Sequence, residues 1–228
     1  MAARTILHWP NPRLQQTAQQ IDQIDEKAID LARDLYDSMT VEFGAGLAAT
    51  QLGILQSMVV ISSDYSEDTT LDVDPKLPDA IVLVNPNITH FGDDKFVWEE
   101  ACLSVPDFSE MVERHSNITL EYLDLTGASH TRELGPPFSG IVQHEVDHLS
   151  GKLYIDRLSP PKRKNAVRVL RMRIKRQKLE AAKKRKWEAQ ERRQEGVKKG
   201  FRVFSSKTLS RKKRPGKCYG KNKRKRKR

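Results

Sequence analysis

The sequence predicts an α+β fold, with mixed or antiparallel strands around a central HExxH helix, then a basic C-terminal helix and a disordered tail. Three observations predict it. Short apolar runs such as SMVVIS, AIVLVNP and ITLEYLDL are typical of strands. Helical patterns precede and follow these runs. The charge changes sign late in the chain, which separates a core-forming body from a basic appendage.

The charge distribution divides the 228 residues into unlike parts. Residues 1–156 carry 9 Lys and Arg against 26 Asp and Glu, a net charge of −17, whereas residues 157–228 carry 32 against 4, a net charge of +28. The body is long enough to bury a core, while the end of the chain has too few large apolar residues to form one. We therefore predict a globular domain at 1–157, a helical extension at 158–195 and a tail at 196–228.

Cysteine usage and hydropathy limit the cellular setting. The cysteines, Cys102 and Cys218, lie in the body and in the tail, so a structural disulfide is not expected and a reducing compartment is indicated. No apolar run reaches the roughly 18 residues of a membrane span. The opening residues lack the pattern of a secretory or transit leader. We expect a cytoplasmic monomer with no membrane partner.

The first half of the body predicts a helix, a loop and a strand. Apolar residues recur at helical spacing, with Asp22 or Asp25 as the N-cap, at Ile24, Ala28, Leu31, Leu35 and Met39. GAGLAATQLG then reads as a loop of small residues, and SMVVIS as a strand. Residues 63–80 hold six acidic residues, one lysine and two prolines, which predicts a solvated surface loop.

The second half predicts further strands and a late helix. AIVLVNPNITHF is expected to form two short strands, broken where Pro86 removes a ladder donor. SNITLEYLDLTGASHTREL alternates and then turns at Thr126-Gly127, which predicts a hairpin. GPPFSGIVQHEVDHLSG reads as a helix that ends at Gly151.

The basic end of the chain predicts a helix followed by disorder. One apolar stripe, surrounded by Lys and Arg, consists of Val167, Leu170, Ile174 and Ala181. A basic amphipathic helix from about Lys162 is therefore expected. Beyond Gly196 the sequence has no periodicity, so we expect a disordered tail.

Two histidines four residues apart indicate a metal site. On a helix His144 and His148 share one face, with Glu145 beside them as a base. The same pattern also occurs by chance in helices whose histidines are packed or solvated. Cys102, the one cysteine of the body, is a candidate third ligand, although a free cysteine is also a common buried apolar residue. Three ligands would leave one tetrahedral position open, as in catalytic sites.

Three segments together resemble the signature motifs of the peptide deformylases, in the same order. They are GAGLAATQLG (44–53), EEACLSVP (99–106) and QHEVDHLSG (143–151). ILHWPNPRL, LVNPNI and LYIDRLSP are also similar to the family, so the likeness covers about residues 5–160. The resemblance implies a catalytic domain that removes the N-terminal formyl group from nascent polypeptides beginning with formylmethionine. Ordered motifs are far more specific than HExxH alone.

The resemblance also implies the roles of the site residues. By the matching positions, Cys102, His144 and His148 bind one divalent metal ion per chain, expected to be Fe(II), with Zn(II) or Ni(II) also able to bind. Glu145 takes a proton from the attacking water and delivers it to the departing amine.

The oxyanion of the reaction requires hydrogen-bond donors. The resemblance assigns this role to the side-chain amide of Gln51 and the backbone N–H of Leu103. Simpler readings are that Gln51 only ties its loop to nearby backbone and that Leu103 is an ordinary core leucine.

The resemblance further implies which residues bind substrate and support the ligands. The pocket for the methionine side chain is expected to involve Gly46, Ile141 and His144, with Glu100 and Val142 beside them. Glu100 and Arg114 occupy positions where the family holds a structural ion pair.

Three positions depart from the family pattern. Ala101 stands where the family has glycine, which implies a backbone cost if the residue needs positive φ, or a narrower pocket if the glycine leaves room for substrate. Ala45, also in the substrate-binding set, is smaller than the usual aliphatic residue. Ser109 falls near an arginine of several relatives. Substrate preference is therefore less firmly implied than the chemistry.

The basic end of the chain suggests a nucleic-acid partner. A net charge of +28 over 72 residues predicts salt-dependent binding to RNA or DNA, and the family resemblance makes the ribosome and its rRNA the expected partner of residues 158–228. A plain solvated extension is the simpler alternative.

Two other functions stay open on the sequence. One is a metal-dependent deacylase of other formyl or acyl amines. The other is an RNA-binding protein that carries a vestigial deformylase domain.

Overall fold

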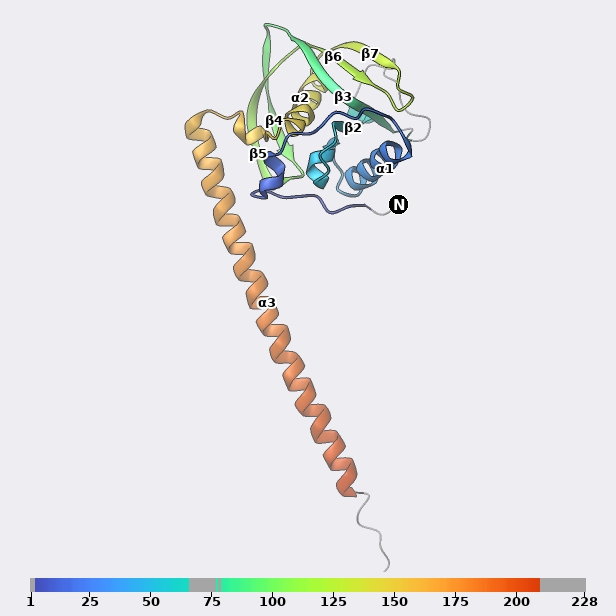
Figure 1. Ribbon diagram of the computed structural model, residues 1–228. Helices are drawn as coiled ribbons and strands as arrows, with labels where there is room; N and C mark the ends of the chain where they lie inside the picture. The colour runs from blue at the N-terminus through green and yellow to red at the C-terminus, as the bar shows by residue number, and fades with distance from the viewer. Residues whose placement is uncertain (1–2, 66–76, 78, 210–228) are drawn as a thin grey trace, which may run out of the picture. The chain divides into compact units, whose positions relative to one another are not determined.

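The structure is a computed structural model of the 228-residue chain, and it describes residues 3–65, 77 and 79–209 (Figure 1). The chain forms two compact units, Met1–Arg168 and Val169–Arg228. The first unit ends eleven residues beyond the predicted boundary at 157, because it includes the start of the last helix. Each unit is described by itself.

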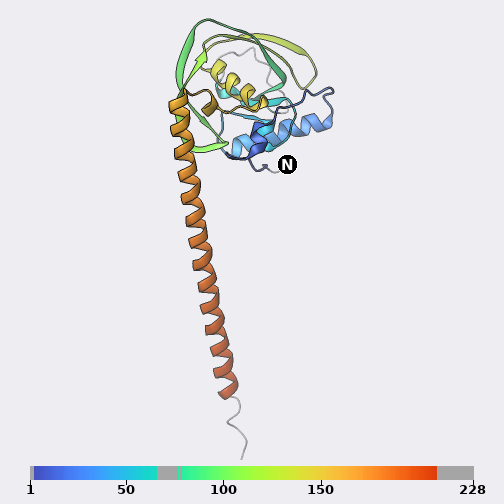
Figure 2. The same ribbon diagram turned by 60° about the vertical axis from the view of Figure 1, so that its left-hand side comes forward.

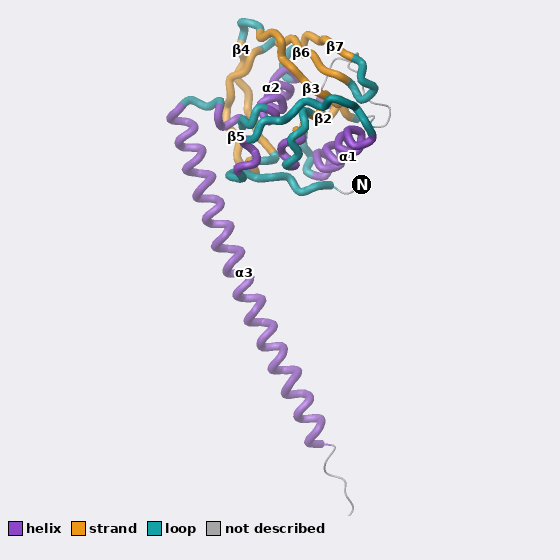
Figure 3. Tube along the Cα trace, viewed as in Figure 1, coloured by secondary structure: helices purple, strands orange, loops and turns teal. Residues whose placement is uncertain are grey.

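The first unit combines two antiparallel sheets with two helices, as the coloured tube of Figure 3 shows. A five-stranded sheet has the order β1 (Gly46–Ala48), β2 (Met58–Ser62), β3 (Ala80–Phe91), β6 (Ile118–Leu123) and β7 (Ser129–Leu134). A hairpin forms the second sheet, from β4 (Lys95–Cys102) and β5 (Val105–His115). The helices are α1 (Glu26–Val41) and α2 (Phe138–Leu149). The short 3-10 helices are Pro12–Gln15, Ala49–Leu52, Ser63–Tyr65 and Tyr154–Asp156.

The large sheet is buried on both faces where β2 and the first half of β3 lie, because these segments are apolar. Alternate residues of a strand point to opposite faces. One set packs with α1 in a core cluster that includes Leu35, Met58 and Val60. The other set packs with α2 in a cluster that includes Val59 and Ile141. The predicted α+β class, with strands around the HExxH helix, is thereby confirmed (Figures 1 and 2).

Both helices of the first unit begin or end at residues that suit these positions. The Asp25 side chain accepts hydrogen bonds from the backbone N–H groups of Lys27 and Ala28, so Asp25 is the N-cap of α1. Gly151 follows α2 with φ of 69°, where a β-carbon would lie 2.4 Å from the Gln15 carbonyl oxygen. Only glycine fits this approach without a shift of the backbone.

One strand prediction was wrong and one strand was missed. β3 is continuous through Asn85-Pro86, because a bulge at this point accommodates the proline, which has no N–H to donate. Asn85 has φ of 52°, and its side chain hydrogen-bonds to both the N–H and the carbonyl oxygen of Ile21. The strand β5 was not predicted, since its many polar residues hide the alternation.

The loop predictions also need correction. Gly44–Gly53 contains β1 and a 3-10 helix rather than loop alone. Of the predicted acidic loop at 63–80, Ser63–Tyr65 form a 3-10 helix and Ala80 begins β3, while residues 66–76 and 78 lie outside the described residues.

The final helix, α3 (Pro160–Leu209), is longer than predicted. It continues past residue 195 to Leu209, so residues 196–209 are helical where a disordered tail was expected. No proline interrupts residues 162–209, which allows the helix to continue. The prediction for residues 210–228 lies outside the described residues. Within the described part of the chain, no helix is both long and apolar enough to cross a membrane.

Candidate metal centre

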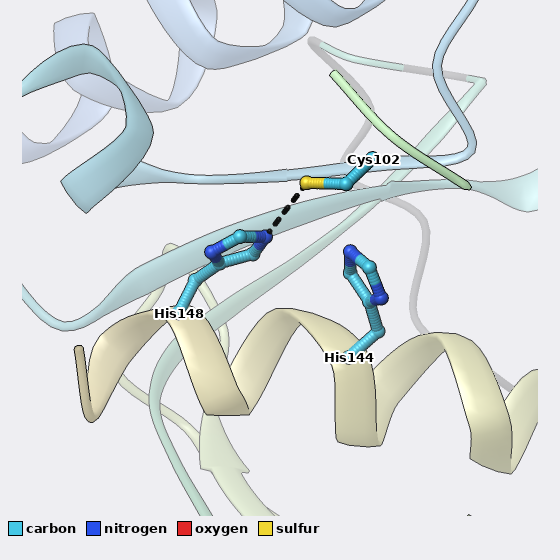
Figure 4. Close-up of side chains that lie close together, drawn as sticks. All are labelled: Cys102, His144 and His148. Carbon is cyan, nitrogen blue, oxygen red and sulfur yellow. Dashed lines mark hydrogen bonds between the residues drawn. The ribbon is translucent and has the colours of Figure 1, made fainter. Parts of the chain in front are cut away.

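Three buried side chains from two elements converge at one point. Cys102 is the last residue of β4, and His144 and His148 lie one turn apart on α2. The candidate ligand atoms all lie within 4.8 Å of one another, and the Cys102 Sγ is 3.2 Å from the His148 Nε2. Figure 4 shows both imidazoles rising from the helix toward the thiol. The structure therefore brings the three predicted ligands together.

This donor set suits a divalent transition metal. A thiolate with two imidazoles is typical of zinc and is compatible with iron or nickel. Burial, with the charge of His144 adding to it, holds the pKa of His148 well below 6.5, so its imidazole is neutral and one of its two ring nitrogens can bind a metal ion. Burial lowers the pKa of His144, but its hydrogen bonds to Cys102 and Glu100 outweigh this and raise the pKa well above 6.5. A bound ion would have to displace that proton.

Glu100 of β4 fixes the orientation of one imidazole. The His144 Nδ1 lies 2.7 Å from the Glu100 Oε2, which leaves the His144 Nε2 for an ion. The Arg114 guanidinium binds the same carboxylate at 2.7 and 2.9 Å, and both side chains are almost fully buried. Burial acts to raise the pKa of Glu100, but these partners outweigh it and hold the pKa at about 2. The ion pair of Glu100 and Arg114 is thus present.

Two further residues complete this network and were missed from the sequence. The Arg114 Nη1 donates to the Asp147 Oδ2 at 2.6 Å, and the Arg157 Nε donates to the same oxygen at 2.9 Å. Asp147 lies three residues after His144 on α2, so helical spacing was the signal that could have found it. The network ties the hairpin to the helix that carries the ligands.

Glu145 is a buried carboxylate with an unusual environment. Burial, with Glu100 adding to it and His144 opposing it, raises its pKa to about 7. Its Oε2 has no hydrogen-bond partner among the described residues. A β-carbon at Gly46 would lie 2.8 Å from the Glu145 Oε1, so the glycine leaves the space that this carboxylate occupies. Such a group is suited to accept and release protons near neutral pH.

Gln51 and Leu103 lie beside the metal centre. The Gln51 Oε1 accepts from the Ala48 N–H at 2.8 Å, while its Nε2 donates to the Ser104 Oγ at 3.1 Å and lies 3.6 Å from the Cys102 Sγ. The amide therefore ties its own loop and also presents its donor end toward the site. Ser104 was not singled out from the sequence. Leu103 follows Cys102 in the turn between β4 and β5. It packs against the core cluster and also lines the cavity.

A cavity of about 930 Å³ opens over the metal centre. Of the predicted substrate residues, those that line it are Ala45, Gly46, Glu100, Ala101 and Ile141. Val142 does not line it, since it points into the core beneath α2 and is fully buried. The lining also includes Phe43, Tyr65 and Trp98, which were not predicted.

The alanine at position 101 carries no backbone cost. Ala101 is an ordinary β4 residue paired with Ser109, and the described non-glycine residues with positive φ are Phe43, Asn85 and Asp107. The substitution of glycine by alanine at this position is therefore compatible with the strand.

The chain is similar to several known proteins over most of its length. A family model described as polypeptide deformylase matches residues 3–164. The peptide deformylase of Nitrosococcus oceani is 39% identical over 181 residues, which covers 79% of this chain and 100% of the relative. That of Agrobacterium fabrum is 35% identical over 168 residues, covering 74% and 94%. The crystal structure of a peptide deformylase from Legionella pneumophila superposes with a TM-score of 0.65 and 35% identity, covering 77% and 98%.

Proposed function

Since the chain belongs to the peptide deformylase family of metal-dependent hydrolases, we propose that Cys102, His144 and His148 hold its metal ion and that Glu145 is its general base. The chain removes the N-terminal formyl group from nascent polypeptides. The observation that carries the proposed roles is the buried, unpartnered Glu145 oxygen beside the three converging ligands. It supports a carboxylate kept for proton transfer rather than for packing.

The metal ion and three residues, Glu145, Gln51 and Leu103, have separate roles in the reaction. A divalent ion in this site supplies Lewis acidity toward a carbonyl oxygen and lowers the pKa of water. Glu145 accepts a proton from the attacking water and returns it to the nitrogen of the departing amine. The Gln51 Nε2 and the Leu103 N–H hold the oxygen that gains charge as the formyl carbon becomes tetrahedral. Formate and a free amino terminus are the products.

The cavity accounts for a peptide substrate. Ala45, Gly46 and Ile141 provide an apolar floor for the methionine side chain, and Ala101 on the exposed edge of β4 faces the peptide backbone. We propose Fe(II) as the physiological ion, as the family resemblance implies. Zn(II) or Ni(II) could replace it, because a thiolate with two imidazoles accepts all three.

A panel of acylated peptides tests the proposed activity. We expect formate release from formyl-Met-Ala-Ser to exceed acetate release from the acetyl-Met peptide by more than about 100-fold, because the acetyl methyl group has to fit beside Glu145 and the ligands. Equal rates on both would favour a general deacylase. No turnover by protein that holds one ion per chain would favour an RNA-binding protein with a vestigial domain.

The basic second unit supports a proposal of ribosome tethering. Residues 169–228 carry 27 Lys and Arg against 4 acidic residues, a net charge of +23. In α3 every residue from 175 to 187 is exposed, so these charges are available to a partner. The negative phosphates of rRNA complement this positive charge. Binding should weaken steeply as the salt concentration rises, because the release of counterions from the RNA then contributes less free energy.

Co-sedimentation with ribosomes tests the tethering. We expect the full chain to pellet with ribosomes at 50 mM salt and to lose about 10³-fold in affinity by 200 mM. Protein shortened after Arg168 should stay in the supernatant and still deformylate short peptides. Pelleting by the shortened protein would contradict the proposal.

A further inference from the structure

Trp98 connects the cavity wall to the support of a metal ligand. On β4 the residues Phe96, Trp98, Glu100 and Cys102 share one face, because side chains of a strand alternate. Cys102 is a ligand, and Glu100 orients another ligand. Trp98 is the next residue along this face, it is half-buried, and its side chain lines the cavity.

The indole ring lies against bare helix backbone. A β-carbon at Gly140 would lie 2.8 Å from the Trp98 Cζ2 and 2.9 Å from the Phe96 Cζ. Gly140 precedes His144 by four residues, so the ring occupies the same side of α2 one turn before the ligand. The absence of a side chain at Gly140 is what allows Trp98 to reach this position.

The indole N–H acts on the same carboxylate that holds His144. The Trp98 Nε1 donates to the Glu100 Oε1 at 2.9 Å. The Oε1 also accepts from the Arg114 Nε. The Oε2 accepts from the Arg114 Nη2 and lies 2.7 Å from the His144 Nδ1. The carboxylate is thus held in one orientation by two donors from the hairpin, and Trp98 is the one that also faces the cavity.

We propose that Trp98 is a specificity-determining and positioning residue for the deformylation reaction. Its ring forms the wall against which the first side chain of the substrate packs, and its N–H holds Glu100 so that His144 points at the metal centre. An unbranched thioether lies flat along an indole face with favourable sulfur–aromatic contact. A β-branched side chain would clash with the ring. This inference rests on the proposed function.

Two substitutions separate the two roles. Trp98→Phe keeps a ring and removes the N–H, so we expect the ion to be released to a chelator about tenfold faster in the absence of substrate. Its preference for formyl-Met-Ala-Ser over formyl-Val-Ala-Ser should change little. Trp98→Leu removes ring and N–H, so it should show the fast release and also lower this preference in kcat/KM by about tenfold.

Phe96→Leu is the matched control. Phe96 shares the strand face and the contact with Gly140 but does not line the cavity. It should destabilise the hairpin without changing ion release or substrate preference. If Trp98→Phe releases the ion no faster than Phe96→Leu, or if Trp98→Leu prefers formyl-Met as strongly as Phe96→Leu does, the proposal is overturned. Absence of formate release by the unmodified protein would overturn the proposed function instead, and ion release would still report on Trp98.

Discussion

Replacement of Glu145 by glutamine is expected to lower kcat for formyl-Met peptides by about 10²- to 10⁴-fold, with the metal content unchanged. Glutamine keeps the shape of the side chain but cannot accept a proton. The Glu145 Oε2 has no hydrogen-bond partner among the described residues, so the substitution breaks no bond to that oxygen. The rate of formate release from formyl-Met peptides, with metal analysis of the same samples, measures the effect.

The control for this substitution is a carboxylate away from the cavity. Glu110→Gln on β5 removes the charge that pairs with Lys162, 3.1 Å away, while the amide oxygen can still accept from the Met111 N–H, so kcat should stay close to that of the unmodified protein. A Glu145→Gln protein that holds its ion and turns over at the normal rate would show that another group takes the proton.

Replacement of Arg114 by leucine is expected to lower the free energy of unfolding by about 3–5 kcal/mol. Arg114 is buried and binds both Glu100 and Asp147, so its loss leaves Glu100 without its main partner and leaves Asp147 with Arg157 alone. Loss of the partner also removes the main force that holds the pKa of Glu100 at about 2 against burial. The pKa of Glu100 would then rise, and its carboxylate would be held less firmly against His144. Urea unfolding and metal content report the two consequences.

Lys95→Leu provides the comparison on the same hairpin. Lys95 pairs with Glu113 at 2.8 Å on the exposed surface, where solvent screens the charges, so the unfolding curve should barely change. An Arg114→Leu protein with normal stability, metal content and activity would show that the buried ion pair does not support the ligands.

The metal centre was predictable because its residues lie in short, ordered motifs. His144 and His148 are four apart on a helix, so local spacing alone places them together. Cys102 is 42 residues earlier, and its place beside them depends on how β4 packs on α2. Spacing does not give that contact, but the resemblance of the three motifs to a known family did.

The support of the ligands was harder to predict. Asp147 and Arg157 act through tertiary contacts with Arg114, and a charged residue in a sequence gives no sign of whether it is buried. Asn85-Pro86 was read as a strand break, although a bulge keeps β3 continuous there and the Asn85 side chain hydrogen-bonds to Ile21. In both cases side-chain hydrogen bonds over long sequence separation decided the outcome, and local patterns do not encode them.

Titration of metal-free protein with Fe(II) in the absence of oxygen, with formate release recorded at each step, tests the central claim most directly. The proposed site predicts that activity rises linearly and levels off at one ion per chain, and that Cys102→Ala and His148→Ala proteins stay inactive over the same range. Full activity without an ion, or a Cys102→Ala protein that titrates like the unmodified chain, would contradict the assignment.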